Sequence, residues 1–231
     1  DPEANIVRFQ RDCHAFVAHA LNAAHGDFES LWSSSQTSRV ECEDGESIVR
    51  QIAYTMANPV EAGLVRKGTS WPGVRQAWPC KPTRVKRPQQ FFQGAAWPEV
   101  AHLRFDRPPG FEDLSSEALE STITQAIESR EISMRNRHAR NSRRFLGRRA
   151  VLSQSRHTRP STKETRFRIS PKLACRDKWR RAERLAQSKC WSAAYTDSLR
   201  TWRAGNSLVL FPLGTYKMRV AFGCNCETTP T

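Results

Sequence analysis

Residues 52–65 read Ile52-Ala53-Tyr54-Thr55-Met56-Ala57-Asn58-Pro59-Val60-Glu61-Ala62-Gly63-Leu64-Val65. Apolar residues recur at helical spacing up to this stretch and predict a helix from about Glu46 to Ala57, with Asp44 as its cap. Asn58-Pro59 then predicts the start of a second short helix, with Asn58 as cap. Residues four positions apart lie on one helix face about 6 Å apart along the axis. The Tyr54 phenol and the Asn58 amide would therefore converge on one small target, such as a phosphate with its metal ion.

These residues resemble the Y-x-x-x-N-P-V-x-A-G-L-V signature of the REP-associated tyrosine transposases, an IS200-like, single-tyrosine branch of the HUH nucleases. The resemblance covers residues 4 to about 95. It implies an α+β fold: a ferredoxin-like antiparallel sheet with helices, incomplete at its N-terminus, and then a mostly helical basic tail. We therefore expect two regions, residues 1–95 from the C-terminal part of the transposase domain and residues 96–231 as the tail.

The resemblance also implies the chemistry. Tyr54 would be the nucleophile, and Asn58 would be one ligand of a divalent Mg or Mn ion. The partner would be single-stranded or hairpin DNA of a bacterial mobile element. The expected product is a 5′-phosphotyrosine with a free 3′-hydroxyl, and a homodimer would exchange the strands.

One part of the family pattern is absent. Relatives hold the metal with a His-hydrophobic-His motif, and no His-x-His occurs in the 231 residues. We expect a missing N-terminal piece of roughly 40–70 residues that carries the first strands and this motif. A lone Asn does not hold a hard divalent cation. The chain as given is therefore expected to bind no metal and to be catalytically inactive.

Charge is concentrated in one part of the chain. Residues 130–190 carry 20 Lys/Arg and 4 Asp/Glu, whereas residues 1–95 carry 11 and 10. Such a block predicts a polyanionic partner, most simply nucleic acid. The alternatives to a transposase are a non-catalytic nucleic-acid-binding protein and a decayed transposon remnant. The candidate nucleic-acid-binding residues are Arg143, Arg144, Arg148, Arg149, Arg176, Lys178, Arg180 and Arg181.

Apolar spacing predicts further helices at residues 5–24, 114–138, 172–187 and 191–203. The Pro- and Trp-rich residues 71–110 are interpreted as an extended linker. No apolar run is long enough to span a membrane. Seven scattered cysteines argue against a disulfide framework and for a reducing, cytoplasmic location. Cys224-Asn225-Cys226 is either half of a zinc site or a pair of free thiols.

Overall fold

The computed structural model describes residues 5–32, 40–72, 78–79, 81–89, 98–155 and 173–228. Within these residues the fold is α+β and about 57% helical. Contacts divide the chain into two units: residues 38–177 form one, and residues 1–37 with 178–231 form the other. The expected region boundary after residue 95 lies outside the described residues.

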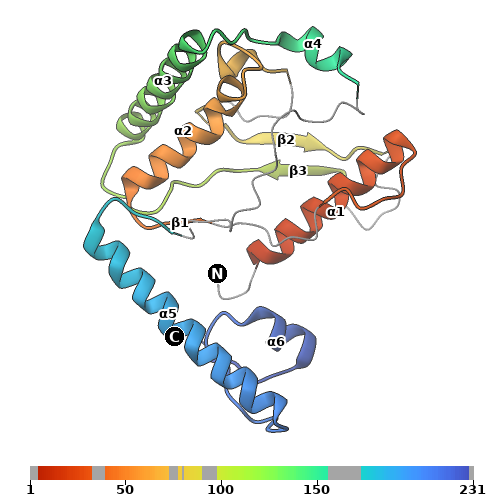
Figure 1. The fold of residues 1–231 in the computed structure, drawn as a ribbon, viewed down its shortest axis with the longest axis vertical. Helices are drawn as coiled ribbons and strands as arrows, with labels where there is room; N and C mark the ends of the chain where they lie inside the picture. Colours follow the sequence, from red (N-terminus) through yellow and green to blue (C-terminus); the bar gives the residue numbers. More distant parts are fainter. Residues whose placement is uncertain are drawn as a thin grey trace. The chain divides into compact units, whose positions relative to one another are not determined.

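The unit formed by residues 38–177 holds the Tyr54 helix (Figure 1). Its helical elements are α2 (Gly45–Glu61), the 3-10 turn η1 (Gly68–Ser70), α3 (Ser116–Arg140) and α4 (Gly147–Ser153). Its strands are β1 (Glu41–Cys42), β2 (Thr83–Lys86), β3 (Val100–Leu103) and β4 (Leu173–Ala174).

Helix α2 begins where the sequence predicts. The Asp44 side chain caps it by accepting the Ser47 N–H at 2.6 Å, and its second oxygen accepts the Arg176 N–H at 2.8 Å. The predicted second helix starting at Asn58 is wrong, because α2 continues through Pro59 to Glu61. Proline removes only one N–H near the helix end, while Ala57 and Val60 are fully buried in the same turns. Asn58 therefore lies inside the helix and is not a cap.

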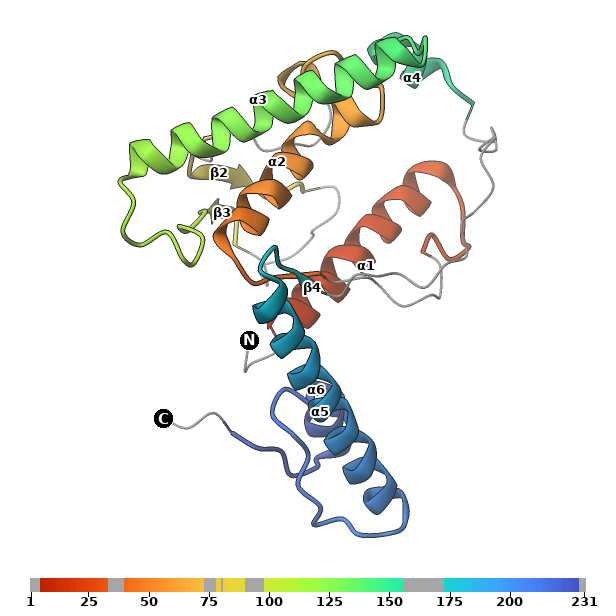
Figure 2. The ribbon, with the colours of Figure 1, turned by 60° about the vertical axis from the view of Figure 1, so that its left-hand side comes forward.

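Helices α2 and α3 lie side by side and enclose the core of this unit (Figures 1 and 2). The predicted helix 114–138 is confirmed with a small shift, since Ser115 caps α3 by accepting the Ala118 N–H at 3.1 Å. Phe111, Leu119 and Ile123 are the buried apolar centre. The partly buried apolar residues packed against them are Ile48, Val49, Ile52, Trp78 and Ile127.

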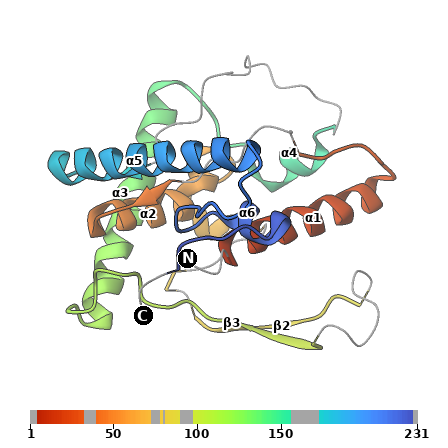
Figure 3. The same ribbon diagram turned by 90° about the horizontal axis from the view of Figure 1, so that it is seen from below.

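Two short sheets accompany these helices. Strands β1 and β4 pair in parallel, with Cys42 opposite Ala174. Strands β2 and β3 pair antiparallel, with Thr83 opposite Leu103 (Figure 3). The second pair lies within the predicted linker, so residues 71–110 are not wholly without secondary structure. Each sheet in the described part of the chain has two strands.

The other unit contains α1 (Asn5–His25), α5 (Lys178–Arg203) and α6 (Tyr216–Phe222). The predicted helix 5–24 is confirmed, and it ends at Gly26, whose φ of 69° suits glycine. The predictions of separate helices at 172–187 and 191–203 are wrong: residues 173–174 are the strand β4, and α5 is continuous. Phe211, Met218 and Cys224 form the core between α5 and α6, packed against Tyr195, Leu199 and Trp202.

Candidate functional site

Tyr54 lies on the surface of α2 beneath an arginine. Its side chain is 39% exposed, and the Arg130 guanidinium carbon of α3 is 4.8 Å from its ring centroid. Such a cation over an aromatic face is attracted by the ring quadrupole. Arg130 is held from the other side by Glu61, with Nη2 and Oε2 2.7 Å apart. The phenol is therefore accessible, and a positive charge is fixed beside it.

Arg130 has more hydrogen-bonding capacity than Glu61 uses. Its Nε–H is buried and has no hydrogen-bond partner among the described residues. The sequence-based selection missed Arg130, although it is the first cation of the basic block. A usable signal was present, because Arg130 and Arg137 are seven positions apart on a predicted helix and hence share a face. Both contact Glu61, Arg137 at 3.6 Å.

Asn58 lies one helical turn after Tyr54 and is exposed. The two residues share one face of the continuous helix, and their convergence on one target stays a prediction. A divalent cation prefers several carboxylate or carbonyl oxygens. The nearest carboxylate along this face, Glu61, is already paired with two arginines. No group of three His, Cys, Asp or Glu side chains suited to a metal occurs within the described ranges. These residues do not fit a divalent ion.

An arginine-rich segment, residues 137–149, continues from Arg130 along the end of α3 and into α4 (Figure 2). It holds six arginines and no Asp or Glu. All six are exposed: Arg137, Arg140, Arg143, Arg144, Arg148 and Arg149. Four of the eight predicted nucleic-acid-binding residues therefore lie in this segment, and the segment lies in the same unit as Tyr54.

Backbone hydrogen bonds fix this segment against the turn that follows α2. The Leu146 N–H donates to the Gly63 carbonyl at 2.9 Å, and the Gly147 N–H donates to the Leu64 carbonyl at 2.8 Å. The Phe145 ring packs edge-on against His138 with centroids 5.2 Å apart. The arginines thus extend from an anchored loop whose position is set by α2 and α3.

Two buried polar side chains fix α3 against the end of α2 and against the turn η1 that follows it. His138 Nε2 lies 3.0 Å from the Val60 carbonyl and 3.1 Å from the Glu61 carbonyl, so this nitrogen carries a proton and donates to the end of α2. Glu131 is 5% exposed and accepts the Gly68 N–H at 2.7 Å, while Arg135 pairs with it at 3.2 Å. These contacts hold Arg130 at the Tyr54 ring.

The remaining predicted basic residues lie elsewhere. Arg176 contacts Glu46 at the start of α2, in the same unit. Lys178, Arg180 and Arg181 are exposed on α5, in the other unit. The eight predicted residues are therefore not brought together within one unit. Part of the basic block, residues 156–172, lies outside the described residues.

The cysteines form no disulfide among the described residues. Cys226 Sγ lies 3.6 Å from the Cys224 carbonyl and 3.8 Å from the Thr215 carbonyl, so backbone oxygens surround it. Burial raises the pKa of the Cys226 thiol, which favours its neutral form. Across the residues that the structure describes, no helix has the length and apolar character needed to cross a bilayer.

No protein-family model, curated protein or solved structure significantly matches this chain. The positions and contacts of its own side chains are therefore the ground for a functional proposal.

Proposed function

We propose that this chain is part of a DNA strand transferase, with Tyr54 as nucleophile and the arginine-rich segment as the surface that binds the strand. The observation that carries the proposal is the exposed Tyr54 side chain, over whose ring Arg130 lies at 4.8 Å, two helical turns before that segment on the same helix α3. Arginine is well suited to phosphate because its planar fork of donors matches two phosphate oxygens. A strand bound along residues 137–149 would bring a phosphodiester near the phenol.

The proposed reaction is a transesterification. The phenolic oxygen of Tyr54 attacks phosphorus, a P–O bond forms to the tyrosine, and the bond to the 3′ oxygen breaks. The phenol gives up its proton, the departing 3′ oxygen gains one, and no oxidant or reductant is needed. Arg130 offsets negative charge on the phosphate oxygens beside the ring, as preorganised cations do in phosphoryl transfer. Rejoining is the reverse attack by a 3′-hydroxyl.

The proposal includes the ferredoxin-like domain that the Tyr54–Asn58 signature implies. Histidine ligands for a metal would have to come from outside the described residues, because no suitable group occurs among them. Asn58 would then be one ligand within a larger set. We assign no step of the reaction to that ion.

The second candidate is a nucleic-acid-binding protein without catalysis. Its supporting observation is that the arginine-rich segment is anchored by the bonds from Leu146 and Gly147, which need no further ligand. Phosphate contacts by such a segment are independent of sequence. This candidate predicts DNA binding and no covalent intermediate.

Binding is tested first with the chain itself. Arg143, Arg144, Arg148 and Arg149 are replaced by Gln, and a second variant replaces Lys178, Arg180, Arg181 and Arg203 to match the loss of four charges. Affinity for a labelled single-stranded oligonucleotide is measured at several salt concentrations. The salt slope should fall by about 0.7 for each lost phosphate contact on a single strand. We expect the first variant to lose more slope than the second; equal slopes in both variants and the parent would contradict the proposed surface.

Catalysis is tested in a chimera, in which the strands that carry the His-x-His motif of a REP-associated tyrosine transposase are joined before this chain. Incubation with Mg²⁺ or Mn²⁺ and a single-stranded element end should give a covalent protein–DNA band on a denaturing gel. Tyr54→Phe should abolish that band, and Tyr195→Phe is the matched control that should keep it. A band that survives Tyr54→Phe would rule out this nucleophile. If the chimera folds and binds DNA but gives no covalent band, the result favours the second candidate, a nucleic-acid-binding protein without catalysis.

A further inference from the structure

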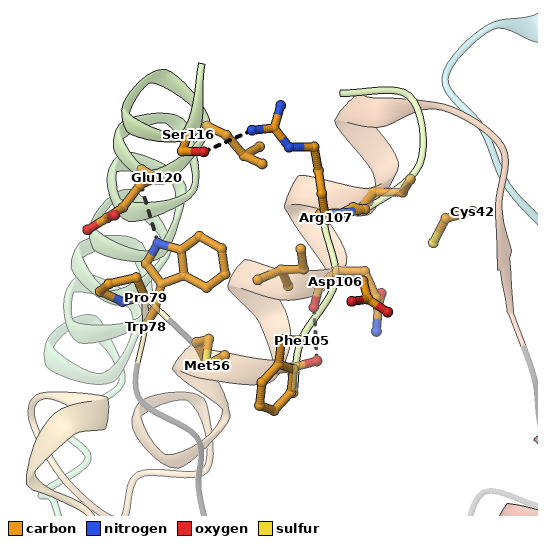
Figure 4. A pocket seen from close by; sticks show the side chains of 15 residues that line it. Cys42, Met56, Trp78, Pro79, Phe105, Asp106, Arg107, Ser116 and Glu120 are labelled. Carbon is orange, nitrogen blue, oxygen red and sulfur yellow. Dashed lines mark hydrogen bonds between the residues drawn. The ribbon is translucent and has the colours of Figure 1, made fainter. Parts of the chain in front are cut away.

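A cavity of about 590 Å³ lies beside α2, between this helix and the first turns of α3. Its walls come from α2, Trp78-Pro79, residues 105–108 after β3 and the first turns of α3. Figure 4 shows Trp78, Phe105 and Met56 around this space, with the Asp106 carboxylate beside it. The volume is within the range of pockets that bind small organic molecules.

The walls are held in place by hydrogen bonds of their own. The Trp78 indole N–H donates to the Glu120 carbonyl at 3.3 Å (Figure 4). Arg107 donates to the Phe111 carbonyl and to Ser116 Oγ, each at 2.9 Å, and also contacts the Leu114 carbonyl. Its guanidinium is therefore engaged in shaping the loop, and the cavity is formed without a ligand.

The chemistry of the lining selects a flat ring over a phosphate. Trp78 and Phe105 offer aromatic faces, on which a base can stack. Asp106 places a carboxylate beside the cavity, and this charge repels phosphate oxygens. A carboxylate is an acceptor that suits the amino group of a base.

The cavity adjoins the face of α2 that carries Tyr54. Gln51 and Thr55 both line it and are exposed. Gln51 is three positions before Tyr54, and Thr55 is three before Asn58, so each is a surface neighbour at about 5–6 Å between Cβ atoms. We propose that this cavity binds one unpaired, amino-bearing nucleobase next to the phosphate that Tyr54 attacks. This inference rests on the proposed function for the source of the base.

Free nucleosides test the cavity apart from phosphate binding and cleavage. Adenosine, cytidine and thymidine are titrated while the Trp78 indole N–H resonance, assigned with Trp78→Phe, is followed by NMR. Adenosine and cytidine should shift it, and thymidine should bind at least several-fold more weakly. Asp106→Ala should remove that preference, whereas Asp113→Ala, an exposed carboxylate outside the cavity, should keep it. Indole is titrated as a flat ring without the amino group of a base. No shift with any nucleoside, or equal binding of indole and adenosine, would overturn the proposal.

Oligonucleotides test the position of the base. A series with one abasic site at successive positions should lose affinity about 5- to 150-fold at a single position, the value of one stacked base. Thr55→Trp, which fills the cavity from an exposed helix position, should bind the intact strand more weakly and be insensitive to that abasic site. Uniform affinity across the series would overturn the placement beside Tyr54. If the protein binds nucleosides but no oligonucleotide, the cavity is a base-binding site and the proposed function is wrong.

Discussion

The two long basic helices, α3 and α5, are stabilised by different chemistry. Helix α3 buries Leu119, Ile123, Glu131 and His138 against its unit, and its arginines pair with carboxylates or carbonyls. Helix α5 buries no residue. Its contacts are made by other side chains: Trp191 stacks on Tyr195 with centroids 5.5 Å apart, and Tyr195 lies 6.0 Å from Phe211. The Trp191 indole N–H and the Ser198 hydroxyl donate to the Leu213 and Leu210 carbonyls, each at 2.9 Å.

The difference concerns the contacts that set the position of each helix. Around α3, polar bonds determine where Arg130 and the anchored loop lie, so the cations have defined neighbours. On α5, Tyr195, Leu199 and Trp202 pack on the core of their unit, while Lys178, Arg180 and Arg181 lie near the other end of the helix. A similar density of arginine in the sequence thus has two different structural meanings.

The largest expected effect tests whether the two regions are separate in stability. Phe211 is fully buried, and Phe211→Ala should lower the free energy of unfolding of the α5–α6 unit by about 3–5 kcal/mol, through lost burial and a cavity. The transition of the α2–α3 unit should stay in place. Leu208→Ala is the control in the same segment, because Leu208 is 80% exposed. Thermal unfolding followed by circular dichroism checks this; an equal loss in both transitions would show that the units are one.

A smaller effect is expected at Glu131, which joins α3 to the 3-10 turn η1. Glu131→Gln keeps the size of the side chain but removes the charge that pairs with Arg135, so the free energy of unfolding should fall by about 1–3 kcal/mol. Glu128→Gln, exposed on the same helix, should change it by less than about 0.5 kcal/mol. Urea denaturation of both variants gives the comparison. If both variants change the free energy of unfolding by a similar amount, the Glu131 contacts do not stabilise this unit.

The smallest effect concerns the Asp44 cap. The Ser47 N–H, and after it the Arg176 N–H, hold the pKa of the Asp44 carboxyl well below its usual range. Asp44→Ala should therefore cost about 1 kcal/mol at pH 7. A lowered folded pKa means that this contribution is complete above the unfolded value of about 3.9 and is lost as pH falls through the folded value. Stability of Asp44→Asn should decline less than that of the parent below about pH 4; parallel pH profiles would contradict the assignment.

Local patterns predicted α1, the start of α2 and α3, because the causes of these elements are local. The apolar spacing of residues 5–24 and Gly26 marked α1, and Asp44 marked the start of α2. The end of α2 was missed because burial of Val60 outweighs the tendency of Pro59 to break a helix. That burial depends on α3, which no pattern near Pro59 reveals.

Contacts between distant segments were beyond the sequence pattern. The β1–β4 pair joins residues 41–42 to 173–174, and proline-rich flanks hid the β2–β3 pair. The candidate site was predicted in part: Tyr54 and Asn58 share a helix face, as expected. Arg130 over Tyr54 and the cavity beside α2 were not found, since both require the packing of α2 against Trp78-Pro79, residues 105–108 and α3.

Photocrosslinking tests most directly the claim that Tyr54 and the arginine-rich segment serve one DNA strand. The chain is irradiated with a single-stranded oligonucleotide that carries a photoreactive uracil, which couples to nearby aromatic side chains, and the modified residues are identified by mass spectrometry. We predict an adduct at Tyr54 that is lost when Arg143, Arg144, Arg148 and Arg149 become Gln and persists when the α5 cations are replaced. Adducts confined to Trp179, Trp191 or Tyr195 of α5, with Tyr54 unmodified, would contradict the account.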